Sequence, residues 1–239
     1  MLISTKAIVL SKLRYKDNDL IIKCYTENFG ICSYLVRNAL KTKKGKFKPA
    51  YFLPLSLLDI EADHKDNRSL QYFKDIKLYC NYKSLHTNII KGAIVMFLSE
   101  LLSSVLIEEE ENQALYNFLE TALVWFDEGD VNANFHLMFL VELTKYLGFY
   151  PELPQQNSKY FNLEDGRFQT VPSSVYSISG DNFSILKHLL GIKFDISKSL
   201  EINSNQKREF LSMILLYFKL HLDGFKQPKS VTILNQVFN

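Results

Sequence analysis

Apolar and polar residues alternate with a period of two along five short segments of the first 80 residues. These segments are rich in β-branched and aromatic residues, so we expect strands at residues 2–13, 19–27, 31–37, 53–61 and 70–79. In the first segment apolar residues occupy both parities, as happens when a small sheet closes into a barrel. Gly30 can supply a positive φ in the turn after the second strand, and Asn38 tolerates the same left-handed region after the third.

From Ser84 onward the apolar period changes from two to about 3.6, which predicts helices. Ser84 is a suitable N-cap for the first of them. The pattern predicts helices from residue 84 to near 108, from about 115 to 128, at 132–147, at 182–190 and at 204–222. The third is apolar nearly all round and should be the buried centre of a bundle. Residues 149–176 form an irregular excursion with a short hairpin at 160–169, and the apolar tail from Lys226 is expected to dock.

The order of these elements predicts an α+β fold. Five short strands with one long basic loop are typical of an oligonucleotide-binding (OB) barrel. We therefore expect a five-stranded OB-fold β-barrel as a nucleic-acid-binding domain over residues 1–80. An α-helical domain should follow over residues 81–239, with the irregular insertion around 149–180 and the docked C-terminal tail.

Charge is divided unevenly along the chain although the formal net charge is only +2. Residues 1–80 hold 15 Lys and Arg against 8 Asp and Glu, whereas residues 81–150 hold 3 against 10. Such an asymmetry indicates two differently used surfaces, one for an anion and one for packing or a protein partner.

The strongest candidate site is the loop at residues 41–48, which has five lysines in eight residues. Clustered ammonium groups repel one another, so a polyanion that neutralises them is the best explanation, although a merely solvated loop would have the same sequence. Arg37 and Lys23 would extend the track onto the barrel. The candidate DNA-binding residues are Lys23, Arg37, Lys41, Lys43, Lys44, Lys46 and Lys48.

Aromatic residues are interleaved with these cations and could stack on bases. The rings belong to Tyr25, Tyr34, Phe47 and Tyr51. Each ring taken singly is more often part of a core than a stacking platform, so only the cations are assigned to the site.

Other classes of function lack support in the sequence. There is no P-loop, no G-x-G-x-x-G and no G-x-S-x-G, so we expect no enzyme and no cofactor. Cys24, Cys32 and Cys80 match no zinc spacing and fit reduced thiols in the cytoplasm. The most apolar runs are interrupted by Glu100 and Glu142 and are too short to span a bilayer. No secretory signal is recognised at the start.

The chain resembles the RecO family of bacterial recombination mediators. The similarity lies in Tyr15-Lys-Asp-Asn-Asp-Leu-Ile-Ile, Tyr25-Thr26, Phe29-Gly30, Val36-Arg37 before the basic loop, Pro54, Leu147-Gly148-Phe149 and Lys229-Ser230. Asn38 replaces the glycine that usually precedes the basic loop in the family. Many relatives also carry a four-cysteine zinc site in the excursion, whereas residues 149–180 contain no cysteine. We therefore predict no zinc here.

The resemblance implies a non-enzymatic role in DNA repair and recombination. A member of this family would bind single- and double-stranded DNA, anneal complementary strands and, with RecR, help RecA replace the single-strand-binding protein SSB. It would bind the C-terminal tail of SSB through its helical domain, have no membrane partner and be cytoplasmic and associated with the nucleoid.

Two other hypotheses remain open. In the first, the chain is a protein-interaction adaptor whose barrel is structural and whose helical surface binds a partner. In the second, which the missing motifs disfavour, it is a hydrolase whose site is assembled only in three dimensions.

Overall fold

The structure is a computed structural model that describes residues 1–41, 47–65, 67–107, 110–154, 156–191 and 200–238. The chain divides into two compact units. The first comprises Met1–Asp130 and Pro228–Val231, and the second comprises Val131–Gln227 and Thr232–Asn239. This division groups two helices with the sheet, so its boundary differs from the one expected near residue 80. That residues 1–80 form a separate domain stays a prediction.

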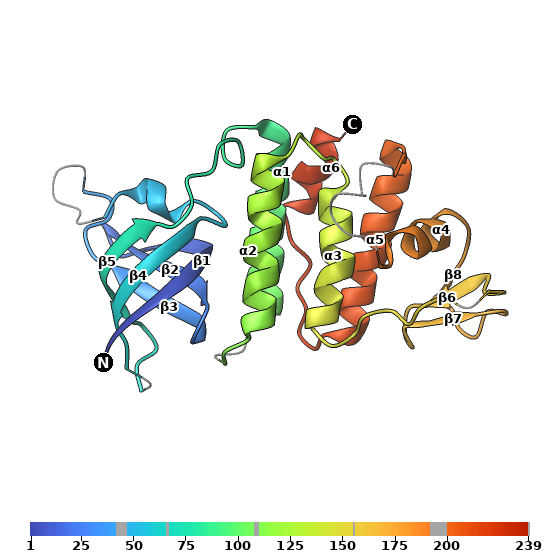
Figure 1. Ribbon diagram of the computed structural model, residues 1–239, viewed down its shortest axis with the longest axis horizontal. Helices are drawn as coiled ribbons and strands as arrows, with labels where there is room; N and C mark the ends of the chain where they lie inside the picture. Colours follow the sequence, from blue (N-terminus) through green and yellow to red (C-terminus); the bar gives the residue numbers. More distant parts are fainter. Residues whose placement is uncertain (42–46, 66, 108–109, 155, 192–199, 239) are drawn as a thin grey trace. The chain divides into compact units, whose positions relative to one another are not determined.

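The first unit is built on a five-stranded antiparallel sheet (Figure 1). The strand order is β3-β2-β1-β4-β5. Five strands were predicted, and their bounds are β1 Leu2–Tyr15, β2 Asp19–Thr26, β3 Gly30–Val36, β4 Leu57–Asp63 and β5 Tyr72–Leu78. The fourth was expected from residue 53, but a 3-10 turn at Pro49–Phe52 and a positive φ at Leu55 delay its start.

The predicted turn residues adopt the left-handed region. Gly30 has a φ of 54° between β2 and β3, and Asn38 has a φ of 55° just after β3. Glycine has no Cβ to clash in this region, and asparagine tolerates it better than most residues. Both expectations from the sequence are therefore confirmed, and β3 ends at Val36, shortly before the basic loop at residues 41–48.

The described strands do not form a fully closed barrel, but the two edges of the sheet approach each other. Leu35 N–H donates to Gln71 O at 2.9 Å, and Gln71 N–H donates to Ser33 O at 2.8 Å. These bonds make an isolated parallel bridge between Tyr34 and Gln71, just before β5. The sheet is thus strongly curved and joined across its edges at one point.

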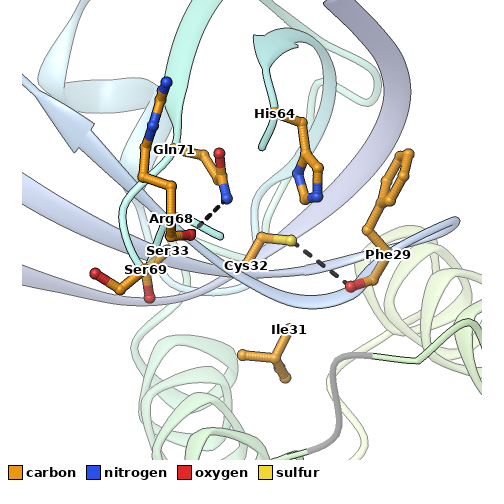
Figure 2. A pocket seen from close by; sticks show the side chains of 8 residues that line it. All are labelled: Phe29, Ile31, Cys32, Ser33, His64, Arg68, Ser69 and Gln71. Atoms are coloured by element: carbon orange, nitrogen blue, oxygen red, sulfur yellow. Dashed lines mark hydrogen bonds between the residues drawn. The ribbon is translucent and has the colours of Figure 1, made fainter. Parts of the chain in front are cut away.

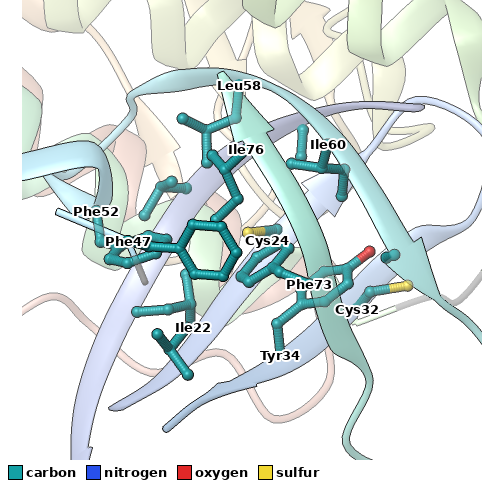
Figure 3. Packing of buried hydrophobic residues seen from close by; sticks show 14 of the residues in the cluster. Ile22, Cys24, Cys32, Tyr34, Phe47, Phe52, Leu58, Ile60, Phe73 and Ile76 are labelled. Carbon is teal, nitrogen blue, oxygen red and sulfur yellow. The ribbon is translucent and has the colours of Figure 1, made fainter. Parts of the chain in front are cut away.

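The concave side of the sheet holds a hydrophobic core (Figure 3). Alternate residues of β2 and β3 point into it, as expected for strands buried on one face. At its centre the rings of Tyr34 and Phe73 stack with centroids 4.1 Å apart, and Phe52 lies 6.0 Å from Phe73. The core fixes the register of the strands that carry the exposed side chains.

Two helices pack with the sheet in the first unit, α1 at Ile89–Val105 and α2 at Gln113–Glu128. Ser84 is not the N-cap of α1: the cap is Asn88, whose side chain accepts from the backbone N–H of Ile90 and Lys91. Ser84 lies in the preceding turn because its carbonyl accepts from the N–H of Asn88. The expected first turn of the helix is therefore a separate turn that leads into it.

Asp127, near the end of α2, holds this turn in place. Its carboxylate accepts from the backbone N–H of Lys83, Ser84 and Leu85, each at 2.8 Å. The buried Lys91 ammonium donates to the carbonyl of Asp127 at 2.9 Å. Burial alone would raise the pKa of Asp127, but the three backbone N–H groups outweigh it and leave the pKa below its usual value.

The docked tail is anchored on α1 by Glu100. Its carboxylate accepts from the backbone N–H groups of Lys229 and Ser230 at 2.8 and 2.9 Å, and from Ser230 Oγ at 2.6 Å. A short helix follows, α6 at Val231–Val237, which the sequence pattern did not predict. One carboxylate therefore fixes residues 228–231 on α1 within the first unit.

The second unit contains the expected buried helix α3, at Phe135–Tyr146, together with α4 at Gly180–Leu189 and α5 at Ser204–His221. The excursion carries a small sheet of β6 Tyr160–Asn162, β7 Arg167–Gln169 and β8 Ser177–Ile178. The hairpin predicted at 160–169 is confirmed. None of the helices in the described parts of the chain is long and apolar enough to cross a membrane.

Candidate nucleic-acid interface

The β1–β2 hairpin extends past the core and lies against the chain that enters the basic loop. Its five-residue end, from Ser11 to Tyr15, pairs with the start of β2 and is solvent-exposed. Asn18 O accepts from Leu40 N–H at 3.1 Å, and Asp19 Oδ1 accepts from Asn38 N–H at 2.8 Å. The hairpin and the loop entrance are therefore held side by side.

Both ends of the basic loop are fixed. Lys41 is exposed and follows Leu40, which is bonded to the hairpin. At the other end Phe47 is buried against Phe73, with ring centroids 6.1 Å apart, and the next residue, Lys48, is exposed. The other predicted loop cations, Lys43, Lys44 and Lys46, lie outside the described residues.

Arg37 extends the cationic surface across the seam between β3 and β5. Its guanidinium carbon lies 5.6 Å from the centre of the Tyr72 ring, and that of Arg68 lies 5.1 Å from the same ring. Two arginines thus share one half-buried tyrosine at the start of β5. Arg68 also donates to Asp63 at 3.2 Å, whereas Arg37 is exposed to solvent.

Exposed cations from three segments therefore gather at one end of the sheet, which we call the basic end. In the part of the chain that the structure describes, no carboxylate lies within ion-pair distance of these side chains. The basic end comprises Lys12, Arg14, Lys16, Arg37, Lys41 and Lys48. Its charge needs an anion from outside the described fold to balance it.

The side chain of Lys23, unlike those of the other predicted cations that the structure describes, forms hydrogen bonds within the protein. Its ammonium group donates to Ser103 O at 2.7 Å and to Leu106 O at 3.4 Å, at the C-terminal end of α1. A cation is favourable there because the helix dipole places negative charge at that end. Burial lowers the pKa of Lys23. The structure thus gives this residue internal partners, and a contact with DNA stays a prediction.

Three of the four candidate stacking rings belong to the core. Tyr25, Tyr34 and Phe47 are at most 8% exposed, and only Tyr51 is half-buried. Tyr25 instead packs against Tyr116 of α2, with ring centroids 6.1 Å apart. The sequence argument that each ring alone is more often core is confirmed for these three.

Sequence reasoning missed part of the basic end. Lys12, Arg14 and Lys16 are spread over an ordinary strand and turn, and only the pairing of β1 with β2 brings them to the loop. Tyr15 and Leu13 expose apolar surface beside them, with 36% and 64% of each residue accessible. Counting charges over residues 11–16 would have identified this segment as basic. It would not have shown that the segment lies beside the basic loop.

The described residues form no competing metal centre. Among them, no group of three or more His, Cys, Asp or Glu side chains could hold a metal ion. The absence of zinc remains a prediction.

His136 of α3 is 1% exposed and stacks on Phe238 with centroids 5.4 Å apart. Burial, together with the charge of Lys207, lowers the pKa of His136 to about 3, so it is neutral at pH 7.

Comparisons with known proteins cover both units. A family model described as the N-terminal part of recombination protein O matches residues 1–82, and one described as its C-terminal part matches residues 86–230. A protein named DNA repair protein RecO from Christiangramia forsetii is 46% identical over 238 residues, with both chains fully covered. Proteins of the same name from Flavobacterium psychrophilum and Bacteroides fragilis are 43% and 34% identical, again over the full length of each. The chain belongs to the RecO family.

Proposed function

We propose that the protein binds single- and double-stranded DNA through the basic end and acts in DNA repair without enzymatic turnover. The relatives' shared name, DNA repair protein RecO, supports the process. The observation that carries DNA binding is the cluster of exposed cations with no described carboxylate partner. Phosphates supply the missing countercharge, and their contacts are independent of sequence.

The first unit is best interpreted as an OB-fold. Five antiparallel strands, strong curvature and the parallel bridge between Tyr34 and Gln71 are features of a small, partly open barrel. In such barrels the loop after the first strand and the loop after the fourth flank the ligand face. Here those loops carry Lys16 and Arg68. Their position supports the basic end as the DNA-binding surface.

We further propose the cellular roles that the resemblance to the RecO family implies. The protein anneals complementary strands because cations screen the repulsion between phosphates while the bases remain accessible. With RecR it assists the loading of RecA onto single-stranded DNA coated with SSB, in the cytoplasm at the nucleoid. These roles predict faster annealing of complementary oligonucleotides in the absence of any nucleotide cofactor.

A groove in the second unit is a candidate for the SSB tail. It has a volume of about 490 Å³ and an apolar lining of Leu163, Ile178, Met213 and Leu216, with Arg208 and Glu209 as its charged residues. An apolar floor with a cation at its rim suits an acidic peptide that ends in apolar residues. Binding of a synthetic SSB tail peptide should be lost when the exposed groove residue Leu216 is replaced, in Leu216→Glu, and retained in a variant of an exposed α5 residue outside the groove, Lys219→Glu.

Titration with a fluorescently labelled oligo-dT at two salt concentrations tests DNA binding. The full chain should bind, and its affinity should fall steeply as salt rises. Replacing Lys41, Lys43, Lys44 and Lys46 by Gln should make the salt dependence shallower by about 0.7 for each phosphate that the protein no longer neutralises. An unchanged slope would remove the loop from the site. The adaptor hypothesis predicts no binding above weak, nonspecific levels.

A further inference from the structure

A polar pocket opens at the seam between β3 and the turn that joins β4 to β5 (Figure 2). Its volume of about 310 Å³ is at the small end of the range for ligand sites, about 300–1,000 Å³. It lies within the first unit and is distinct from the basic end. Its lining includes Phe29, Ser33, His64, Arg68, Ser69 and Gln71.

The pocket has two chemically different sides. Figure 2 shows the rings of Phe29 and His64 on one side, and these rings lie with centroids 4.7 Å apart. On the other side lie Arg68, Ser33 and Ser69, which can offer hydrogen bonds. A flat group with an apolar face and a polar edge would match both sides.

Gln71 makes the polar side rigid. Its side-chain oxygen accepts from Lys65 N–H at 3.0 Å, and its amide nitrogen donates to the carbonyls of Lys65 and Arg68 at 3.0 and 2.8 Å. Gln71 is 5% exposed, and its backbone also forms the bridge to β3. Lys65 and Arg68 are therefore held in place before any ligand arrives, which reduces the entropy lost on binding.

Arg68 connects the pocket to the basic end. It lines the pocket and shares the Tyr72 ring with Arg37, at 5.1 and 5.6 Å. A strand whose phosphates follow the cations from Lys41 through Arg37 would pass the pocket mouth at Arg68. Because Asp63 already balances the charge of Arg68, the pocket is a poor site for a free anion and a better one for a neutral group.

We propose that this pocket receives one unpaired nucleobase of a bound DNA strand. The inference rests on the proposed DNA binding at the basic end and adds a preference for single strands over duplex DNA. A base in a duplex is stacked and paired, so it would have to be extruded at a cost of a few kcal/mol to enter. A base of a single strand enters freely and stacks against the rings, with its polar edge toward Ser33 and Ser69.

The test compares two tryptophan variants in the same turn. Ser69 and Asn67 are both exposed, but only Ser69 lines the pocket. Ser69→Trp should fill the mouth and weaken oligo-dT binding about 5- to 150-fold, the range expected for losing one stacked base. Asn67→Trp should bind like the unmodified protein. Because neither change alters charge, the salt slope and the affinity for a matched duplex should stay the same in both variants.

A second experiment removes the base from the DNA instead of blocking the pocket, by using an abasic oligonucleotide. The unmodified protein should bind an abasic strand of equal length more weakly than oligo-dT, by about the same factor by which Ser69→Trp weakens oligo-dT binding. Ser69→Trp itself should no longer distinguish the two strands, because the base and the pocket contribute one shared interaction.

The outcomes separate this inference from the function it rests on. If the unmodified protein binds no oligonucleotide, the proposed function fails. If it binds oligo-dT and the abasic strand equally, or if Ser69→Trp distinguishes them as well as Asn67→Trp does, DNA binding stands and the base pocket is overturned.

Discussion

Charged side chains on the helix-bearing side of the first unit have partners within the protein, whereas those at the basic end are exposed and have no carboxylate partner in the described fold. On the helix-bearing side, Lys6 pairs with Glu120 at 3.0 Å, and Lys23 donates to the end of α1. Asp127 accepts three backbone N–H groups. At the basic end six exposed cations have no carboxylate of the described fold within ion-pair distance.

The difference separates structural from functional charge. A charge removed from water must be matched inside the protein, since an unmatched one would be strongly destabilising. A cation left on the surface stabilises little, and several together repel one another. The first group should therefore control stability and the second group ligand binding, and variants of each should affect only one of these properties.

The largest effect on stability is expected from Asp127→Ala. It leaves three backbone N–H groups without an acceptor and removes a negative charge that favours the ammonium form of the buried Lys91, so the free energy of unfolding should fall by about 3–5 kcal/mol. The neighbouring Glu128, with 62% of its side chain exposed, is the matched control, and Glu128→Ala should cost less than about 0.5 kcal/mol. Urea unfolding followed by circular dichroism measures both. Equal losses would contradict the structural role of Asp127.

A smaller effect with a distinct pH dependence is expected from Glu100→Gln. Burial alone would raise the pKa of Glu100, but the hydrogen bonds from Ser230 and Lys229 hold it below its usual value. The free energy of unfolding should fall by about 1–2 kcal/mol at pH 7. The gap to the unmodified protein should persist above the unfolded pKa of about 4.3 and close as pH falls through the lowered folded pKa.

The control for Glu100 is the half-buried Glu142, which pairs with the exposed Lys145 on α3 at 3.6 Å and accepts no backbone N–H in the described structure. Glu142→Gln should change the free energy of unfolding by at most about 0.5 kcal/mol at any pH. A stability gap for Glu100→Gln that grows as the solution is acidified would show that its carboxylate is not the group that clamps the tail.

The smallest effect on stability is expected at the hairpin. Replacing Lys12, Arg14 and Lys16 together by Gln should change the free energy of unfolding by no more than about 0.5 kcal/mol for each site. The salt slope of oligo-dT binding should nevertheless become shallower by about 2, at 0.7 for each phosphate contact. The same change at Lys145, Lys159 and Lys219 in the second unit is the charge-matched control. A shift of equal size in the control would mean that net charge, not the basic end, governs binding.

Local pattern was sufficient for most of the fold. Alternation located all five strands of the large sheet, and the turn residues Gly30 and Asn38 were recognised because few residues accept a positive φ. Helical periodicity located α1, α2 and α3 because the spacing of apolar residues shows which face of a helix is buried. Apart from α6, which was not predicted, the errors lie at element boundaries, where contacts with distant residues decide the outcome. Ser84 is a good cap in isolation, but Asp127 holds its turn, and Asn88 caps the helix instead.

The candidate site was less predictable because strand pairing assembles it. Lys23 follows the same charge pattern as its neighbours, yet the register places it under the end of α1. Lys12 and Arg14 reach the basic end only through the pairing of β1 with β2, and Arg68 reaches Arg37 only through the bridge at Gln71. The loop at 41–48 could be recognised because its charge is concentrated in consecutive residues.

The most direct test of the central claim is the salt dependence of oligo-dT binding by the unmodified protein. If the six described cations of the basic end bind phosphates, the logarithm of the association constant should fall against the logarithm of salt concentration with a slope of about −4 or steeper. Replacing all six by Gln should leave a slope of about −2, which the remaining loop lysines Lys43, Lys44 and Lys46 would carry at about 0.7 each. A slope between about 0 and −1 for the unmodified protein would contradict the account.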